Sequence, residues 1–266
     1  MELLHKDRTE QLIRGFFIVQ NEVGLGRDEE AYQRAFEIWA EEQNLTVFSK
    51  PASPLTIEGH EVCMLYPDFV AWHDLIIELK ALPRKLGPSE ELQLFDYLRA
   101  RQCRLGLIVN MGLDRVHVER RIYDPPPTQL VENWEYWTHR IGGREREIAV
   151  ALRRALHILY ATHKTGYSQS VTEKLILGAL ATSNLRVQTR PIAKATFHQK
   201  VVHESAIECF VIEDRFALTL TVHFDSDEFV KSLGLSHLKA LDLPWGIAAN
   251  FGRTDLQITA LRHRQH

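Results

Sequence analysis

The chain has few cysteines, no long apolar run and no excess of positive charge, and each shortage excludes a class of protein. Its 266 residues include only three cysteines, Cys63, Cys103 and Cys209. These are too few and too widely spaced for a disulfide framework or a four-cysteine metal or iron–sulfur site. No apolar run reaches the ~18 residues that span a bilayer, and residues 1–15 lack the features of a signal peptide. We therefore expect a cytoplasmic protein with buried free thiols, no iron–sulfur cluster and no membrane partner.

The balance of charge gives no global sign of a polyanionic partner. Lysine and arginine total 32 and aspartate and glutamate total 35, so the formal net charge is −3. Any contact with nucleic acid must therefore be local. Arginines do gather in three groups, although each group taken alone can equally be a solvated face interleaved with acids. The groups are Arg99, Arg101 and Arg104; Arg115, Arg120 and Arg121; and Arg140, Arg144, Arg146, Arg153 and Arg154.

The sequence aligns with itself, without a gap, at a shift of 140 residues. The coincidences fall at turn-forming glycines, at strand starts and on apolar faces, which is typical of an internal duplication. They include Gly26 with Gly166, Asn44 with Asn184, Pro51 with Pro191, Asn110 with Asn250 and Gly112 with Gly252. We therefore predict a first domain at 1–124, a linker at 125–143 and a second domain at 144–266.

The predicted linker begins in proline-rich sequence and ends in glycine. The DPPP run at 124–127 and the pair Gly142–Gly143 suit a connection that cannot continue a strand or a helix. Three aromatic residues, Trp134, Tyr136 and Trp137, lie between them. We expect these rings to pack across the two domains, with stacking on a nucleic-acid base as the alternative.

The first copy shows the pattern of a mixed sheet with flanking helices. Apolar residues recur at helical spacing after Asp28, and Ser89 can cap a second helix whose first turn is acidic. Runs of β-forming residues, interrupted by proline and glycine, predict short strands. The expected elements are a helix at 28–43, strands at 45–50, 54–58, 61–72 and 74–82, a helix from Ser89, a buried strand at 105–110 and an edge strand at 114–122. This order predicts an α/β fold.

Charged residues interrupt the apolar run PDFVAWHDLIIELK at 67–80. Alternation along its second strand places Glu78 and Lys80 on one face, and a hairpin would bring Asp68 to the same end of the sheet. Two neighbouring carboxylates resist joint ionisation unless a cation lies between them, and Mg²⁺ accepts carboxylates together with a backbone carbonyl, here that of Leu79. Lys80 could then orient or deprotonate the attacking water. The alternative is a structural ion pair between Glu78 and Lys80.

Two helices carry further polar residues toward this region. Glu29 lies three residues before Tyr32, so it should point along the buried face of its helix. The alternative is a solvated acid in the first turn, favoured by the helix dipole. Gln93 and Tyr97 stand one turn apart on a common face of the second helix.

Taken together, these residues resemble the catalytic signature of the PD-(D/E)xK nuclease superfamily. Asp68 followed by Glu78–Lys80 is similar to its central motif, and Gln93 with Tyr97 resembles the QxxxY element of its RecB-like branch. Many relatives in that branch hold an iron–sulfur cluster with four cysteines, which this chain does not have.

A closer resemblance is to the GxxExxY proteins. Gly26, Glu29 and Tyr32 in GLGRDEEAY match the motif that names this family, and QLFDYL and GLIVNMG follow in the order that it shows. The similarity covers about residues 5–123. Each motif alone occurs often by chance, whereas their joint order and spacing is more specific.

The resemblance implies two restriction-endonuclease-like domains related by duplication, and hydrolysis of phosphodiester bonds in nucleic acid, DNA in preference to RNA. The enzyme would be an endonuclease or exonuclease that depends on Mg²⁺ or Mn²⁺. The implied roles are metal binding for Asp68, Glu78 and the Leu79 carbonyl, with help from Glu29; water activation for Lys80; and substrate contact or support for Gln93, Tyr97 and Tyr32. The alternative is a non-catalytic nucleic-acid-binding or assembly subunit with a nuclease-like fold. A homodimer or a partner protein is also open.

The second copy departs from this pattern. At the 140-residue shift, six site positions become Gln169, Thr172, Leu218, Leu220, Leu233 and His237, and Asp68 alone keeps an acid, as Glu208. The glycines and apolar positions persist while the polar residues are lost. We therefore predict a degenerate second domain that keeps the fold without the chemistry.

Overall fold

The computed structural model describes residues 4–223 and 225–263. Over these residues the protein has mixed sheets with helices packed on them, in agreement with the predicted α/β class. None of the described helices combines the length and the apolar character needed to cross a bilayer.

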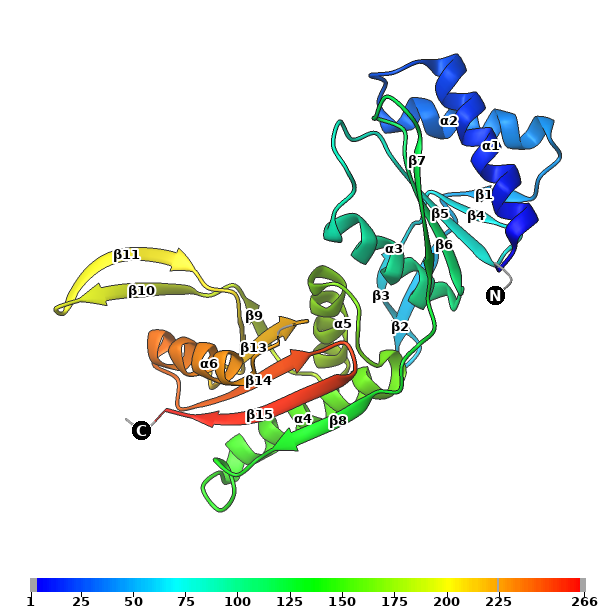
Figure 1. Ribbon diagram of the computed structural model, residues 1–266. Coiled ribbons are helices and arrows are strands. Elements are labelled where there is room, and N and C mark those ends of the chain that lie inside the picture. The colour runs from blue at the N-terminus through cyan, green and yellow to red at the C-terminus, as the bar shows by residue number, and fades with distance from the viewer. Residues whose placement is uncertain (1–3, 224, 264–266) are drawn as a thin grey trace. The chain divides into compact units, whose positions relative to one another are not determined.

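The chain divides into two compact units. The first unit runs to Leu55 and resumes at Met64–Pro125. The second unit contains Thr56–Cys63 and the chain from Pro126 onward. Each unit has a large sheet, and the described residues also form two separate two-stranded hairpins (Figure 1).

The first unit is built on a five-stranded mixed sheet. Its elements are α1 (Lys6–Val23), α2 (Glu29–Glu42), β1 (Val47–Ser49), β2 (Ser53–Ile57), β3 (His60–Leu65), β4 (Phe69–Ala71), β5 (Leu75–Lys80), α3 (Pro88–Arg101), β6 (Leu105–Asn110) and β7 (His117–Ile122). The strand order is β1-β4-β5-β6-β7, in which only β5 and β6 are parallel. The hairpin β2–β3 forms a separate sheet, and most of it, Thr56–Cys63, belongs to the second unit.

Helices α1 and α2 pack against each other and cover one face of this sheet. Phe16 of α1 stacks on Phe36 of α2 with ring centroids 4.5 Å apart, and Phe36 meets Phe69 of β4 edge-on at 5.1 Å. Gly15 permits the close approach of the two helices, because a Cβ there would lie 2.3 Å from the Trp39 ring. This aromatic packing fixes α2 over β4.

Helix α3 covers the opposite face and connects the two parallel strands. Leu94 and Leu98 of α3 pack with Ile76 of β5 and Ile108 of β6. Gly106 is required in β6, since a Cβ there would lie 2.7 Å from Leu94. The β5–α3–β6 connection brings the carboxyl ends of both strands to the same edge of the sheet.

The strand expected over 61–72 is instead two strands, so that prediction was wrong at its centre. Pro67 has no N–H to donate to a strand ladder, and regular pairing ends at Leu65 and resumes at Phe69. The break leaves Asp68 immediately before β4 rather than inside a continuous strand.

The second unit repeats this order of elements after one additional strand. Its elements are β8 (Gln129–Asn133), α4 (Gly143–His163), α5 (Gln169–Thr182), β9 (Val187–Thr189), β10 (Ile192–Phe197), β11 (Lys200–Ala206), β12 (Phe210–Ile212), β13 (Phe216–Val222), α6 (Asp227–Leu241), β14 (Trp245–Phe251) and β15 (Asp255–Arg262). The six-stranded sheet has the order β8-β15-β14-β13-β12-β9, with β13 parallel to β14. A repeated order of this kind is what the predicted duplication would produce.

The shift that relates the two units is not constant along the chain. Ser49 pairs with Phe69 in the first unit, and Thr189 pairs with Phe210 in the second. The shift is therefore 140 residues from Ser49 to Thr189 but 141 from Phe69 to Phe210. The gapless alignment expected from the sequence is wrong for β12 and β13.

A β-bulge in β11 accounts for the extra residue. Ala195 pairs with His203 and Thr196 pairs with Val201, so Val202 has no partner in the hairpin ladder. A bulge inserts one residue without disturbing the strands on either side. The insertion thus raises the shift to 141 residues in β12 and β13 and leaves their pairing intact. The shift is again 140 in β14, where Ala248 corresponds to Ile108 of β6.

The segment expected to be a linker contributes to the second unit. Strand β8 lies within 125–143 and pairs in parallel with β15, so part of the predicted linker belongs to the second sheet. Trp137 is 4% exposed, meets Phe216 edge-on at 5.4 Å and donates its indole N–H to the Leu261 carbonyl at 2.9 Å. All these partners belong to the second unit, which corrects the expectation that Trp137 packs across the two domains.

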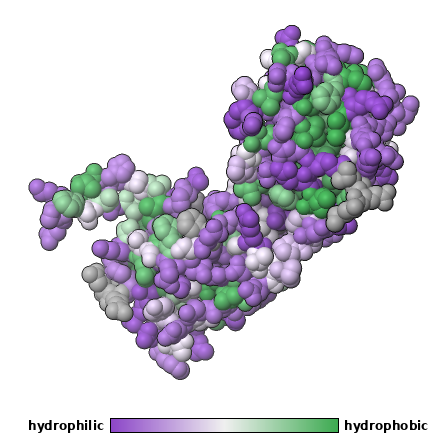
Figure 2. Space-filling model, in the orientation of Figure 1, coloured by the Kyte–Doolittle hydropathy of each residue, from purple (hydrophilic) through white to green (hydrophobic). Residues whose placement is uncertain are grey.

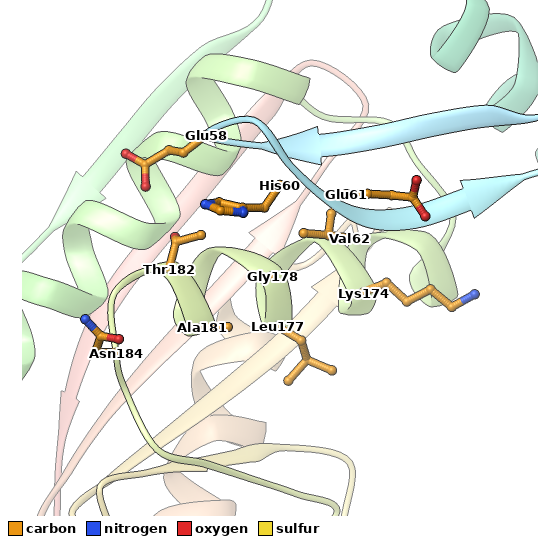
Figure 3. A pocket seen from close by; sticks show the side chains of 10 residues that line it. All are labelled: Glu58, His60, Glu61, Val62, Lys174, Leu177, Gly178, Ala181, Thr182 and Asn184. Carbon is orange, nitrogen blue, oxygen red and sulfur yellow. The ribbon is translucent and has the colours of Figure 1, made fainter.

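Residues 56–63 lie against α5 in the second unit (Figure 3). A Cβ on Gly178 would lie 2.2 Å from Val62, so glycine is needed at this contact. The pocket beside it, of about 700 Å³, is lined by Glu58 and Glu61 on one side and by Lys174 on the other.

The corresponding hairpin of the second unit, β10–β11, is exposed along both strands. Ile192, Phe197, Val201 and Val202 each expose more than half of their surface. Figure 2 shows these apolar side chains among polar ones at the left of the view. A two-stranded hairpin is marginally stable alone, and apolar groups exposed in this way are typical of a contact surface.

Candidate active site

Asp68, Glu78 and Lys80 meet at one end of the first unit's sheet. Strands β4 and β5 are antiparallel, with Ile77 opposite the first residue of β4. Asp68, one residue earlier, therefore comes opposite Glu78. Ile77 and Leu79 belong to the core beneath α1 and α2, which leaves Glu78 and Lys80 on the face covered by α3.

Glu78 and Lys80 form a buried ion pair. The Glu78 side chain is 2% exposed, and its Oε1 accepts a hydrogen bond from Lys80 Nζ at 2.6 Å. Glu78 Oε2 is buried and accepts no hydrogen bond within the described residues. An unpaired buried carboxylate oxygen is costly, so this atom is a candidate ligand for a cation.

Asp68 is held by one main-chain and one side-chain donor. Its Oδ2 accepts from the Leu79 N–H at 2.8 Å, and its Oδ1 accepts from Gln33 Nε2 at 2.7 Å. In a strand, the N–H and C=O of one residue point to the same side, so the Leu79 carbonyl also points toward Asp68. No residue of β4 pairs there, because the strand begins at Phe69.

Helix α2 brings Glu29 to the same site. Asp28 caps the helix by accepting from the Ala31 N–H at 2.9 Å, which makes Glu29 its first residue. Glu29 Oε2 lies 3.9 Å from Lys80 Nζ, and its Oε1 accepts from Gln33 Nε2 at 3.2 Å. The Glu29 side chain remains 39% exposed. Glu29 therefore stands at the mouth of the site, beside the lysine.

Burial raises the pKa of all three acids, and the charge of Asp68 adds to the rise for Glu78 and Glu29. Burial, followed by the charge of Asp68, raises the pKa of Glu78 to about 8. Burial also raises the pKa of Asp68, although the Leu79 N–H and the charge of Lys80 partly offset the rise. The pKa of Glu29 is raised by burial and, to a smaller extent, by Asp68. A cation placed among these groups would favour their charged forms.

Lys80 keeps its proton at this site. Burial alone would lower its pKa, but the charge and hydrogen bond of Glu78, with smaller effects of Glu29 and Asp68, outweigh burial and raise it. An ammonium donates hydrogen bonds and cannot accept a proton from water. A protonated Lys80 can donate hydrogen bonds to a water or a phosphate oxygen at this site.

The oxygen atoms at this site suit a hard divalent cation, although they do not form a complete coordination shell. Within the described part of the chain, no three His, Cys, Asp or Glu side chains form a preassembled metal-binding group. Asp68 and Glu78 nevertheless offer carboxylates, Leu79 offers a carbonyl, and Glu78 Oε2 lacks a partner. Mg²⁺ and Mn²⁺ take such oxygen ligands together with several waters.

Gln93 and Tyr97 line the site from α3, whereas Tyr32 supports it from a distance. Gln93 Nε2 donates to the Tyr97 hydroxyl at 2.8 Å. Burial, then the charge of Glu78, raises the pKa of Tyr97, which places this ring close to Glu78. Tyr32 is fully buried, and its hydroxyl donates to the Gly24 carbonyl at 2.8 Å. Tyr32 thus fixes the turn before α2 and does not face a substrate.

The sequence did not single out two residues that the structure places at the site. Gln33 is 5% exposed and bridges Glu29 and Asp68; its position one turn after Glu29 was the available signal. Lys50 lies near the acids, since its charge lowers the pKa of both Glu29 and Asp68. Lys50 had no comparable signal, because the chain brings it there through the antiparallel pairing of β1 and β4.

Asn110, at the end of β6, holds the loop that follows Lys80. Its Oδ1 accepts from the N–H groups of Leu82 and Gly112, at 2.9 and 3.1 Å. Its Nδ2 donates to the carbonyls of Leu82 and Arg84, at 3.1 and 2.8 Å. Gly112 allows this contact, because a Cβ there would lie 2.5 Å from the backbone of Ala81. The sequence signal was that Asn110 and Gly112 both recur in the second copy.

Asn110→Ala is expected to lower the free energy of unfolding of the first unit by about 1–3 kcal/mol, because it leaves buried main-chain groups unsatisfied. Urea unfolding measures this change. Asn21→Ala, at an exposed position on α1, is the control and should leave stability nearly unchanged. Equal stability of the two variants would show that Asn110 does not hold the loop.

The second unit has uncharged residues at the strand positions that carry Asp68, Glu78 and Lys80 in the first unit. The Lys50 N–H donates to the Asp68 carbonyl at 2.9 Å, and the Arg190 N–H donates to the Cys209 carbonyl at 3.1 Å. Cys209, and not Glu208, is therefore the counterpart of Asp68. Glu208 is instead an exposed acid whose side chain pairs with that of Arg190 at 3.1 Å.

Strand pairing gives the other two counterparts. Ile77 pairs with the first residue of β4 and Leu218 pairs with the first residue of β12, so Thr219 replaces Glu78 and Thr221 replaces Lys80. Thr219 Oγ1 lies 2.8 Å from Nδ1 of His237. Burial lowers the pKa of His237. The equivalent site therefore contains Cys209, Thr219, Thr221 and His237 in place of the residues expected from the sequence. All four side chains are neutral near pH 7. Burial, then the charge of Glu208, raises the pKa of Cys209 to about 12.

A mixed sheet with an acid before one strand and a Glu-x-Lys on the next defines the first unit as a nuclease-like α/β domain. Residues 6–122 match the family model described as the PD-(D/E)XK nuclease superfamily. The first unit is thus a PD-(D/E)XK nuclease-like domain. Comparison with curated proteins and with solved structures returned no match.

Proposed function

We propose that the protein is a metal-dependent nuclease that hydrolyses phosphodiester bonds in nucleic acid, with DNA as the favoured substrate. The observation that carries this proposal is the meeting of Asp68, Glu78, Lys80 and Glu29 at one edge of the nuclease-like unit. The GxxExxY motif around Glu29 supports assignment to the GxxExxY proteins, because the carboxylate of this glutamate lies 3.9 Å from the Lys80 amine.

Asp68, Glu78 and the Leu79 carbonyl are the proposed ligands of Mg²⁺ or Mn²⁺. When bound, the ion would neutralise negative charge on the scissile phosphate. Gln33 and the Leu79 N–H fix the Asp68 carboxylate, so that this ligand is oriented before substrate arrives.

In the proposed reaction, Lys80 donates hydrogen bonds and Glu29 accepts a proton. The protonated amine of Lys80 donates hydrogen bonds to a phosphate oxygen or to the attacking water, which stabilises developing negative charge. Glu29 is partly exposed beside it and has a raised pKa, which suits a group that accepts a proton from water. Gln93 and Tyr97 would contact substrate from α3.

One charged site in each chain favours cleavage of one strand at a time. The second unit holds Cys209, Thr219 and Thr221 where the first holds Asp68, Glu78 and Lys80, so it cannot supply a second catalytic centre. Nicking, single-strand cleavage and end processing fit this arrangement. Cutting both strands would take two chains or two successive events.

The test is cleavage of plasmid DNA and of labelled DNA and RNA oligonucleotides with Mg²⁺, with Mn²⁺ and with EDTA. We expect cleavage only with a divalent ion, nicked circles before linear product, and loss by about 10²- to 10³-fold in Lys80→Ala. Thr221→Ala changes the equivalent position of the second unit and should cleave normally. Cleavage that persists in EDTA or in Lys80→Ala would refute the proposal.

The second candidate function is a non-catalytic subunit that binds nucleic acid or assembles with a partner protein. The lack of a preassembled three-residue metal group among the described residues favours it, as does the neutral second site. Calorimetric titration with Mn²⁺ separates the two functions. Binding that is lost in Asp68→Ala supports the nuclease, and absence of binding in the wild-type protein supports the subunit.

A further inference from the structure

The loop between β8 and α4 (Figure 1) and the first turns of α4 carry several aromatic and basic residues of the second unit. A pocket of about 400 Å³ opens there, and its lining includes Trp134, Trp137, Ile141, Arg146, Val150 and Arg153. Residues 134–154 contain five arginines against three glutamates, although the whole chain has a net charge of −3. The basic character of this surface is therefore local.

Two tryptophans form a fixed aromatic wall of the pocket. Trp137 is buried and anchored through its hydrogen bond to the Leu261 carbonyl. The Trp134 ring lies 5.3 Å from it, and the Trp134 indole N–H donates to Glu132 at 3.1 Å. The orientation of Trp134 is thus set before any ligand arrives, which lowers the entropic cost of binding.

Cations surround this wall, and two of them have no acidic partner. The Arg153 guanidinium lies 5.8 Å from the centre of the Trp134 ring and is paired with Glu132 at 2.6 Å. Arg140 and Arg146 are exposed, and neither forms an ion pair within residues 4–223 and 225–263. These two arginines can contact phosphate without breaking an existing pair.

We propose that this pocket, lined by Trp134, Val150 and Arg146, binds single-stranded nucleic acid. An unpaired base stacks beside Trp134, against the apolar side chain of Val150, which is 62% exposed. Arg146 in the lining and Arg140 in the neighbouring loop contact the phosphates. Binding by the second unit does not require that the first unit cleaves, so the two proposals stand or fall separately.

The aromatic wall selects single-stranded nucleic acid over the other polyanions that arginines attract. A base in a duplex is already stacked and paired, so it cannot enter the pocket without being extruded. An unpaired base offers a free face for stacking, which contributes a large share of single-strand affinity. An acidic protein segment would use the arginines but would gain little from Trp134.

The test is fluorescence anisotropy with labelled oligo-dT, in EDTA, using full-length Glu78→Gln protein so that no cleavage occurs. Trp134→Ala should weaken binding by roughly 10-fold or more, the effect of losing one stacked base. Arg146→Glu should weaken it by a similar factor and reduce the dependence of affinity on salt concentration. A duplex of the same sequence should bind more weakly than the single strand.

Two controls separate the pocket from general effects. Trp134→Phe keeps an aromatic face and should bind nearly as well as the parent, which shows that loss in Trp134→Ala is not misfolding. Arg253→Glu changes an exposed arginine outside the pocket and should have little effect. Unchanged affinity in both Trp134→Ala and Arg146→Glu, no binding by the parent, or equal competition by polyglutamate would overturn the proposal.

Discussion

Replacing Glu78 with glutamine is expected to abolish cleavage while making the first unit more stable above neutral pH. Glutamine keeps the size of the side chain but removes a proposed metal ligand, so the cleavage rate should fall by about a hundred- to a thousandfold or more. Stability should change in the opposite direction, because the wild-type protein must bury a carboxylate beside Asp68 and the amide avoids that cost. We expect Tm at pH 8.5 without divalent ions to rise by roughly 5 °C.

The second unit supplies the matched control for this substitution. Thr219 occupies the position equivalent to Glu78, and Thr219→Val should leave the cleavage rate unchanged. Plasmid-nicking rates and thermal melts of the two variants, measured beside the wild type, give both quantities. A Glu78→Gln protein that cleaves normally, or that melts below the wild type at pH 8.5, would show that Glu78 is a structural residue.

The stability of the first unit is expected to fall as the pH rises from 5 to 8 in EDTA, and to recover when Mg²⁺ is added. The pKa of Glu78 is 4.5 in an unperturbed chain and about 8 in the folded protein, because of burial and then the charge of Asp68. Between these values the folded state binds more protons than the unfolded state, so rising pH favours unfolding. The raised pKa values of Asp68 and Glu29 act in the same direction.

Comparison with Glu78→Gln isolates this contribution from the other titrating groups. Burial lowers the pKa of His163 and His237 in the second unit, so those residues favour stability as the pH rises. Thermal melts at pH 5, 6, 7 and 8 should therefore be compared as the difference in Tm between the wild type and Glu78→Gln. That difference should grow by several degrees toward pH 8 and shrink with Mg²⁺, since metal and protons compete for the carboxylates. A difference that is flat across the range would contradict the assigned pKa shift.

Local rules were sufficient to predict which charged side chains of the first unit lie on the same face. Strand alternation placed Glu78 with Lys80, and the structure puts both on the face that α3 covers. Helical periodicity over 28–43 predicted α2, which the structure shows at Glu29–Glu42. These predictions depend only on residues a few positions apart, where side-chain direction follows from secondary structure.

Features that depend on distant contacts could not be predicted in this way. The counterpart of Asp68 is Cys209 because one bulged residue, Val202, moves the numbering, and nothing in the sequence marks a bulge. The proton on Lys80 is retained because of the opposing effects of burial and three acids. Strand β8 finds its partner in β15, more than a hundred residues later in the chain.

The conserved strand pairing of the second unit gives a route to an engineered enzyme. Cys209, Thr219 and Thr221 occupy backbone positions that carry Asp68, Glu78 and Lys80 in the first unit, so three substitutions would transplant the charged triad. Such a chain would carry two centres, and plasmid would be converted to linear DNA in a single encounter at low protein concentration. If only nicked circles formed, the second scaffold would lack more than its charges.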